Sequence, residues 1–157
     1  MASEQDLAEQ LLRRANEDAT GANGMLPIDE VADVLVCFHA QQAIEKALKA
    51  VLAARGVEFA HRHDLRVLIG QCENAGLRLP EELVEVDLLS PYAAELRYDD
   101  DTVHAVDRET ASRWATSAVQ WARGLVEQAR GGQTSSADPE AVECASLDHG
   151  EGSDVKR

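Results

Sequence analysis

The sequence predicts an all-α protein, an up-and-down bundle of four to five helices followed by a disordered C-terminal tail. Hydrophobic residues make up 45% of the 157 residues but aromatic residues only 4%, so the core is built mainly from Leu, Val, Ile and Ala. The β-branched and aromatic runs typical of strands are scarce. Apolar residues instead recur at steps of three and four, the period of a helix, as far as about residue 130.

The first two helices are expected over residues 4–18 and 28–55. Ser3 is placed to cap the first helix, and the segment TGANGMLP is expected to end it. Gly56 is expected to end the second helix, as a C-terminal glycine commonly does.

The apolar side of this second helix changes direction midway. Val31, Leu35 and Phe38 share one side, whereas the apolar residues of the second half share a side rotated by more than a right angle. The side vacated by the first group is taken over by four polar residues. These are His39, Gln42, Lys46 and Lys49. They either line a cleft or a dimer seam, or they belong to a helix that passes from the core into solvent.

Three later helices have their own start and stop signals. Asp64 can cap a third helix, which ends at Gly76. Pro80 opens a fourth, which is expected to kink or break at Pro91 and to resume through residue 96. The last helix starts at about Asp107 and carries a regular apolar stripe. Short connections between the helices favour an up-and-down bundle.

The chain is expected to divide into a folded domain over residues 1–130 and an acidic tail over residues 131–157. The tail has no apolar periodicity and is rich in Gly, Ser, Asp and Glu, so it buries too little apolar surface to fold. The formal net charge is -14, and residues 1–130 alone carry 13 Lys and Arg against 23 Asp and Glu. A general electrostatic grip on nucleic acid or on an anionic membrane is therefore not expected, and any phosphate contact depends on a few local cations.

Other site classes lack their sequence signals. The three cysteines include no CxxC pair, which argues against a disulfide framework and a zinc site. There is no glycine-rich phosphate loop, no nucleophile elbow and no run of 18 apolar residues, and the segment MASEQDLAEQ has no basic region followed by an apolar stretch. We expect no metal and no cofactor. We expect the protein to be cytoplasmic.

The string VCFHAQQAIEKALKAVLAARGVEFAHRHDLRVLI, followed by LPEEL and PYAAELRY, resembles the prokaryotic HEPN domain family, of the type associated with small nucleotidyltransferases. That family shows a long helix of the form CFHAQQAAEKALKALL, a THDL-like helix start and a YAVEARYP-like segment. The resemblance covers residues from about 6 to 130. It implies a bundle of four or five helices that commonly dimerises. Its members include ribonuclease toxins, partners of small nucleotidyltransferases and binding modules.

The resemblance also implies a candidate catalytic pair. Catalytic HEPN ribonucleases carry an Arg and a His separated by four to six intervening residues, at the junction of the last two long helices. Arg97 and His104 match this pattern with six intervening residues. A histidine near neutrality can accept the proton of an RNA 2′-hydroxyl, and a guanidinium can hold the phosphate, so no metal is required. Tyr98, however, matches the non-toxin branch of the family, and three aspartates between the pair would repel RNA.

The preferred hypothesis is a HEPN protein that binds a nucleotide or RNA phosphate and pairs with a small nucleotidyltransferase in a toxin–antitoxin or defence system, as a homodimer. The first alternative is a metal-independent endoribonuclease toxin that uses Arg97 and His104, and the second is a purely structural helical adaptor. The binding surface is expected to include His39, Gln42, Lys46, Lys49 and Tyr98.

Overall fold

The computed structural model describes residues 3–93 and 106–134. In chain order its elements are α1 (Glu4–Met25), α2 (Asp33–Ala54), α3 (Leu65–Asn74), the 3₁₀ helices η1 (Glu81–Leu83) and η2 (Val86–Ala93), and α4 (Arg108–Thr134). No strand occurs within these two ranges. The predicted all-α bundle is therefore confirmed.

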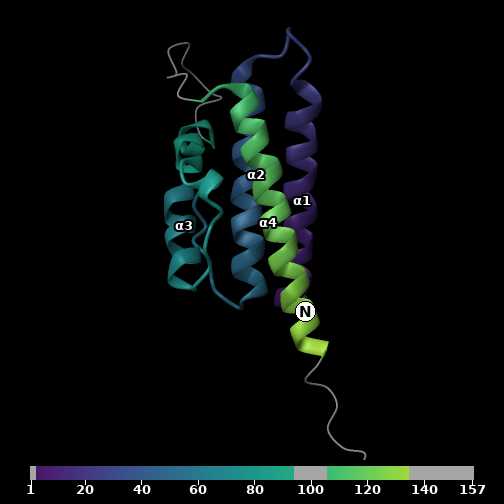
Figure 1. Ribbon diagram of the computed structural model, residues 1–157, viewed down its shortest axis with the longest axis vertical. Helices are drawn as coiled ribbons and strands as arrows, with labels where there is room; N and C mark the ends of the chain where they lie inside the picture. The colour runs from purple at the N-terminus through teal and green to yellow at the C-terminus, as the bar shows by residue number, and fades with distance from the viewer. Residues whose placement is uncertain (1–2, 94–105, 135–157) are drawn as a thin grey trace, which may run out of the picture.

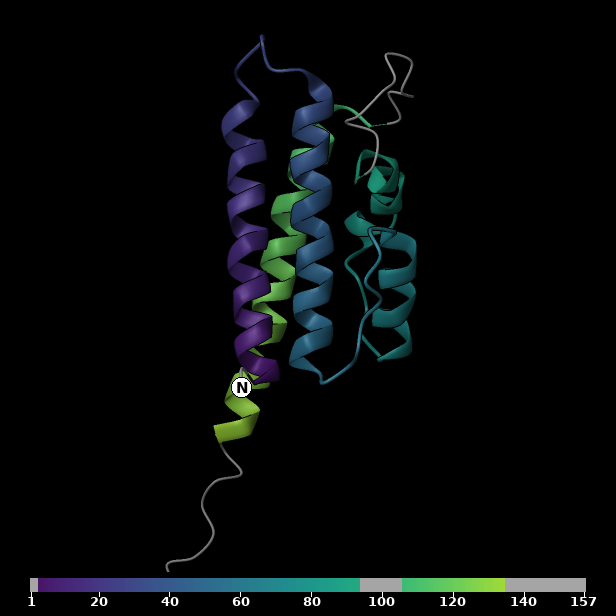
Figure 2. The same cartoon turned by 180° about the vertical axis from the view of Figure 1, so that it is seen from behind.

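Three long helices lie side by side, and the shorter elements flank one of them (Figure 1). Seen from behind, α2 lies between α1 and α3 (Figure 2). α1 runs antiparallel to α4, since Asn23 near its end donates to Thr116 near the start of α4, at 3.0 Å, and Glu9 pairs with Arg130 near the end of α4. α1 is likewise antiparallel to α2. α2 and α4 therefore run in the same direction, and the chain returns between them through α3, η1 and η2.

The core is built from small and aliphatic side chains, as the composition predicts. The buried residues of α1 are all alanines, namely Ala8, Ala15, Ala19 and Ala22. Because alanine projects only a methyl group, α1 can approach α2 and α4 closely along its length. α2 is the central helix, and its buried residues cover most of its circumference.

α1 is longer than the sequence suggests, since it continues to Met25 instead of ending at residue 18. Gly21 and Gly24 are accommodated inside the helix, although each costs roughly 1 kcal/mol relative to alanine. Asn23 of this added segment accepts a 2.5 Å hydrogen bond from the buried hydroxyl of Ser112 on α4. Contacts with α4 thus stabilise a helical stretch that its own residues disfavour.

α2 starts at Asp33, later than the expected Ile28. The connection from α1 to α2 is held by Arg108 of α4, whose guanidinium donates to the carbonyl oxygens of Met25, Ile28 and Val31 at 2.7, 3.3 and 3.0 Å. These carbonyls would otherwise need a partner in a partly buried turn. Arginine can serve several acceptors at once because it carries five N–H donors in a planar fork.

The expected fourth α-helix is replaced by η1 and η2, and the break expected at Pro91 is absent because Pro91 lies inside η2. The buried side chains of this segment recur at every third position. They are Leu83, Val86, Leu89 and Tyr92. A step of three matches the 3.0 residues per turn of a 3₁₀ helix rather than the 3.6 of an α-helix.

The helix caps predicted from the sequence are confirmed. Ser3 and the third residue of α1 form a reciprocal capping box, and Asp64 accepts a 2.9 Å hydrogen bond from a backbone amide in the first turn of α3. Gly56 and Gly76 follow α2 and α3 with φ angles of 65° and 77°. Only glycine adopts this left-handed region without strain.

Some predictions fall outside the described residues. Arg97, Tyr98 and His104, together with the expected extension of the fourth helix through residue 96, lie in the range 94–105. α4 itself extends to Thr134, so the first four residues of the tail expected over 131–157 are helical instead. The remaining residues of that tail, 135–157, lie outside the described residues.

Candidate functional site

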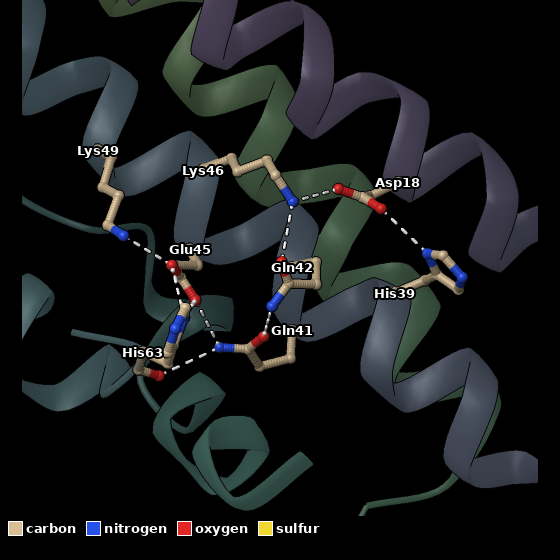
Figure 3. Close-up of polar contacts among 8 residues, drawn as sticks. All are labelled: Asp18, His39, Gln41, Gln42, Glu45, Lys46, Lys49 and His63. Atoms are coloured by element: carbon tan, nitrogen blue, oxygen red, sulfur yellow. Dashed lines mark hydrogen bonds and ion pairs between the residues drawn. The ribbon is translucent and has the colours of Figure 1, made fainter. Parts of the chain in front are cut away.

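The polar residues predicted on α2 form one row along that helix. His39, Gln42, Lys46 and Lys49 recur at steps of three and four, which places them on the same side of α2. α1 reaches this row through Asp18, and His63, in the segment before α3, contacts Glu45, the partner of Lys49 (Figure 3). The row is therefore part of a hydrogen-bonded network that joins three segments.

The α1 side of the network is centred on Asp18. Nζ of Lys46 lies 2.6 Å from Oδ2 of Asp18, and Nδ1 of His39 lies 3.0 Å from Oδ1. Lys46 also donates to Oε1 of Gln42 at 3.0 Å. The Asp18 and Lys46 side chains are 19% and 22% exposed. Lys46 is thus held between α1 and α2 but still reaches solvent.

The α3 side of the network is centred on Glu45, whose side chain is only 5% exposed. Its carboxylate accepts hydrogen bonds from Nζ of Lys49 at 2.7 Å and Nε2 of Gln41 at 3.0 Å, and lies 3.1 Å from Nδ1 of His63. Burial is the largest single influence on the pKa of Glu45 and raises it. The hydrogen bonds from Lys49, Gln41 and His63 and the charge of Lys49 together outweigh burial, so the pKa lies below its usual range.

A pair of glutamines connects the two sides. Nε2 of Gln42 donates to Oε1 of Gln41 at 2.7 Å. Gln41 is fully buried and also donates to the carbonyl oxygen of His63 at 3.2 Å. The side-chain amides thus have partners on both sides, which orders the whole row (Figure 3).

This arrangement decides which groups can meet a ligand. Each of the two lysines already has a carboxylate partner, so a phosphate would compete with Asp18 or Glu45 for its ammonium group. Lys49 is only 12% exposed, whereas the side chains of His39 and His63 are 37% and 70% exposed. Lys46 and His39, which share Asp18, are the better placed pair for an anion arriving from solvent.

Two members of the apolar row predicted on the second helix, Leu35 and Phe38, lie at the surface of α2, whereas Val31 precedes α2. Leu35 is 39% exposed, and Val31 and Phe38 are half-buried. The core contacts of the first half of α2 are made instead by Val36 and Cys37. Phe38 packs edge to face with the imidazole of His39, at 5.4 Å between ring centroids. The apolar row therefore adjoins the polar row on one side of α2.

Sequence reasoning missed the two partners from other segments, Asp18 and His63, and the burial of Glu45. A signal for Asp18 exists in the sequence, because Asp18 stands three residues after Ala15 and four before Ala22 on the inward side of α1. An acid among buried positions needs a cationic partner. Which helix provides that partner depends on packing, which the local pattern does not specify.

Neither a metal site nor a membrane-spanning helix occurs within the described ranges. Residues 3–93 and 106–134 contain no group of three or more His, Cys, Asp or Glu side chains that could hold a metal ion. In the same two ranges, no helix is both long and apolar enough to cross a membrane.

The comparisons with known proteins agree with the resemblance noted in the sequence. The model of the HEPN domain matches residues 8–130, and the chain belongs to the HEPN domain family. The chain is also similar to the crystal structure of an archaeal HEPN homologue, ST0689, with a TM-score of 0.47 and 22% sequence identity. That similarity covers 80% of this chain and 96% of the archaeal one. No curated protein matches the chain.

Proposed function

We propose that this HEPN protein binds the phosphate of a nucleotide or RNA on the polar row of α2 and pairs with a small nucleotidyltransferase in a toxin–antitoxin or defence system. The observation that carries the proposal is the placement of two lysines and one histidine along one side of α2, with His63 from the segment before α3 in contact with Glu45, in a chain with a net charge of -14. Local cations on an acidic protein favour a ligand that is small and doubly or triply charged over a long polyanion.

The exchangeable contacts of Lys46 support phosphate binding. Its ammonium group is 2.6 Å from Asp18 and 3.0 Å from Gln42, so it is already oriented and loses little side-chain freedom when a ligand arrives. A phosphate oxygen that replaces Asp18 would meet the same ammonium and the neighbouring imidazole of His39. We expect Gln42 and Lys49 to keep these groups in position, and Tyr98 to contribute from outside the described residues.

The apolar row supports association with a protein. Leu35, Val31 and Phe38 present exposed or half-buried carbon beside the cations, a mixture typical of interfaces with an apolar centre and a polar rim. We assign this row to a homodimer contact or to the nucleotidyltransferase. Light scattering of the purified chain tests the first, and co-purification with a small nucleotidyltransferase encoded beside it tests the second.

Phosphate binding is tested by calorimetric titration of the purified chain with ATP and with a short single-stranded RNA in EDTA. The expected result is saturable binding that Lys46→Gln weakens by about tenfold, which corresponds to about 1.4 kcal/mol. Arg123→Gln is the matched control, since Arg123 is an exposed cation on α4 that contacts Asn16 at 3.2 Å. Equal losses of affinity in both variants would show that binding depends on the net charge of the protein rather than on Lys46. If neither ligand binds and no partner is found, the structural helical adaptor is the hypothesis that remains.

A second candidate, a metal-independent endoribonuclease, is favoured by one feature of the chain. Arg97 and His104 lie between the end of η2 at Ala93 and the start of α4 at Arg108, the junction where catalytic HEPN proteins carry this pair. Cleavage of RNA in EDTA to 2′,3′-cyclic phosphate ends, abolished by His104→Ala, would establish this function. RNA that stays intact over the same incubation supports the binding protein.

A further inference from the structure

A second surface lies on the other side of the molecule from α1, between α3, the segment that follows it, and η1. It is a groove of about 550 Å³ whose walls are mostly aliphatic. The aliphatic lining residues are Ile69, Leu77, Leu79, Leu83 and Val84. Leu77 and Leu83 are 4% and 1% exposed and form its floor. The groove is thus continuous with the hydrophobic core.

The outer edge of the groove exposes apolar surface. Val84, which lines the groove, is 66% exposed, the largest value among the bulky hydrophobic residues described. Single exposed apolar residues are common, but a groove with an aliphatic floor and an exposed aliphatic edge is typical of a surface that receives a partner.

The rim of the groove is acidic. Glu73 lines it, and three exposed glutamates, Glu81, Glu82 and Glu85, stand within three residues of the lining residues Leu83 and Val84 in the sequence. Arg78 is the cation in the lining. The nearby Arg66 is committed to Asp87 on η2, with its Nη2 2.8 Å from Oδ2. Among the described residues at this groove, the rim therefore presents several carboxylates against the single guanidinium of Arg78.

This charge selects among the possible occupants. A second copy docked through the same surface would bring two acidic rims together, because a two-fold contact pairs a patch with itself. The C-terminal residues 131–157 carry six acidic against two basic residues and are repelled for the same reason. Nucleic acid and anionic membranes are disfavoured by the same sign of charge. A basic amphipathic protein segment complements both the aliphatic floor and the acidic rim.

We propose that the groove between α3 and η1 docks a net-positive amphipathic segment of a protein partner. Aliphatic side chains of that segment fill the space over Leu77 and Leu83, and its Lys or Arg side chains pair with the glutamates of the rim. This surface is separate from the polar row of α2, so the inference holds whether or not that row binds phosphate.

Peptide selection against the full chain tests the proposal. A random 16-residue phage library is selected on the wild-type protein and counter-selected on Val84→Asp. The selected peptides are expected to carry net positive charge, with aliphatic residues at helical spacing. By fluorescence polarisation, Val84→Asp and the pair Glu81→Lys with Glu85→Lys are each expected to weaken binding at least tenfold. Val67→Asp is the matched control and is expected to bind normally, because Val67 lies on the other side of α3 from Ile69 and is exposed.

Three results would overturn the proposal. One is a selection that yields only acidic peptides, or one that yields no peptide whose binding depends on Val84. Another is equal binding to the wild type and to Val84→Asp, with both proteins folded by circular dichroism. The third is light scattering in which Val84→Asp converts a dimer to a monomer, since a second copy would then be the occupant. Lys46→Gln should leave peptide binding unchanged, which separates this test from that of phosphate binding.

Discussion

Replacing Lys49 with methionine is the sharpest test of the α2 network. Lys49 is the only ammonium within hydrogen-bonding distance of Glu45 among the described residues, at 2.7 Å, and its side chain is 12% exposed. Methionine keeps much of the aliphatic length but removes the charge. The variant leaves the Glu45 carboxylate in place, 5% exposed, without a full positive charge beside it.

The expected loss follows from burial. Breaking a buried ion pair by removing one partner costs about 3–5 kcal/mol, because the remaining charge is left uncompensated. Glu45 keeps its hydrogen bond from Gln41 and its contact with His63, so we expect the lower end, a fall in the free energy of unfolding of about 3 kcal/mol. The double variant Glu45→Gln with Lys49→Met removes the stranded charge, and we expect it to be more stable than Lys49→Met by at least about 1 kcal/mol.

Urea denaturation followed by circular dichroism at 222 nm measures these differences. With a slope of about 2 kcal/mol/M, a loss of 3 kcal/mol lowers the midpoint by about 1.5 M. A pH series also tests the direction in which the loss of stability changes with pH. The pKa of Glu45 is lowered in the folded wild type, so its contribution is present above the ordinary glutamate pKa and is lost as the pH falls through the lowered value. Removing Lys49 takes away two of the influences that lower the pKa of Glu45 and leaves burial, which raises it. We therefore expect a higher pKa for Glu45 in the variant than in the wild type, and a smaller deficit at pH 5 than at pH 7.5.

Two outcomes would refute this reasoning. A Lys49→Met variant that loses less than about 1 kcal/mol at pH 7.5 would show that the pair is solvated like a surface salt bridge. A double variant as unstable as Lys49→Met would show that the loss comes from packing around residue 49 rather than from the stranded carboxylate.

Three further changes test other parts of the structure. Arg108→Met removes the guanidinium that serves three loop carbonyls, and we expect thermal melting to show a loss of about 2–3 kcal/mol. Gly76→Ala and Gly56→Ala should each cost about 1–2 kcal/mol for their left-handed backbone. The Cβ added at Gly56 lies 2.9 Å from the end of the flexible Glu4 side chain, which can move away, so no further cost is expected there. A loss near zero for either variant in urea melts would contradict this. Burial raises the pKa of Cys37 to about 11 and of Cys72 to about 12. Iodoacetamide at pH 8, with the modified residues mapped by mass spectrometry, should therefore label them only after unfolding.

Local signals predicted the existence of the helices and their caps. A capping serine, a capping aspartate and glycines that follow a helix act within one turn, so Ser3, Asp64 and Gly56 could be assigned from the sequence. The boundaries that were wrong depend on distant residues. α1 continues past its glycines because Ser112 contacts Asn23, and α2 starts late in a turn that Arg108 holds together.

The candidate site was predictable to a similar extent. Helical spacing placed His39, Gln42 and Lys46 on one side of α2, because neighbours on a helix surface follow from its period alone. The state of those side chains was not predictable, since Asp18 comes from another helix and turns a solvent-facing lysine into a paired one. Partners contributed from elsewhere in the fold decide whether a cation is available to a ligand.

Asp18→Asn tests the availability of Lys46 most directly. Asparagine keeps the size and hydrogen-bonding shape of Asp18 but removes the charge that competes with phosphate for Lys46. If the α2 row binds phosphate by exchange, calorimetric titration with ATP should give about five- to tenfold tighter binding to Asp18→Asn than to the wild type, a gain of about 1 kcal/mol. Binding that is unchanged or weaker in Asp18→Asn would show that Lys46 is not a phosphate ligand and would contradict the proposed site.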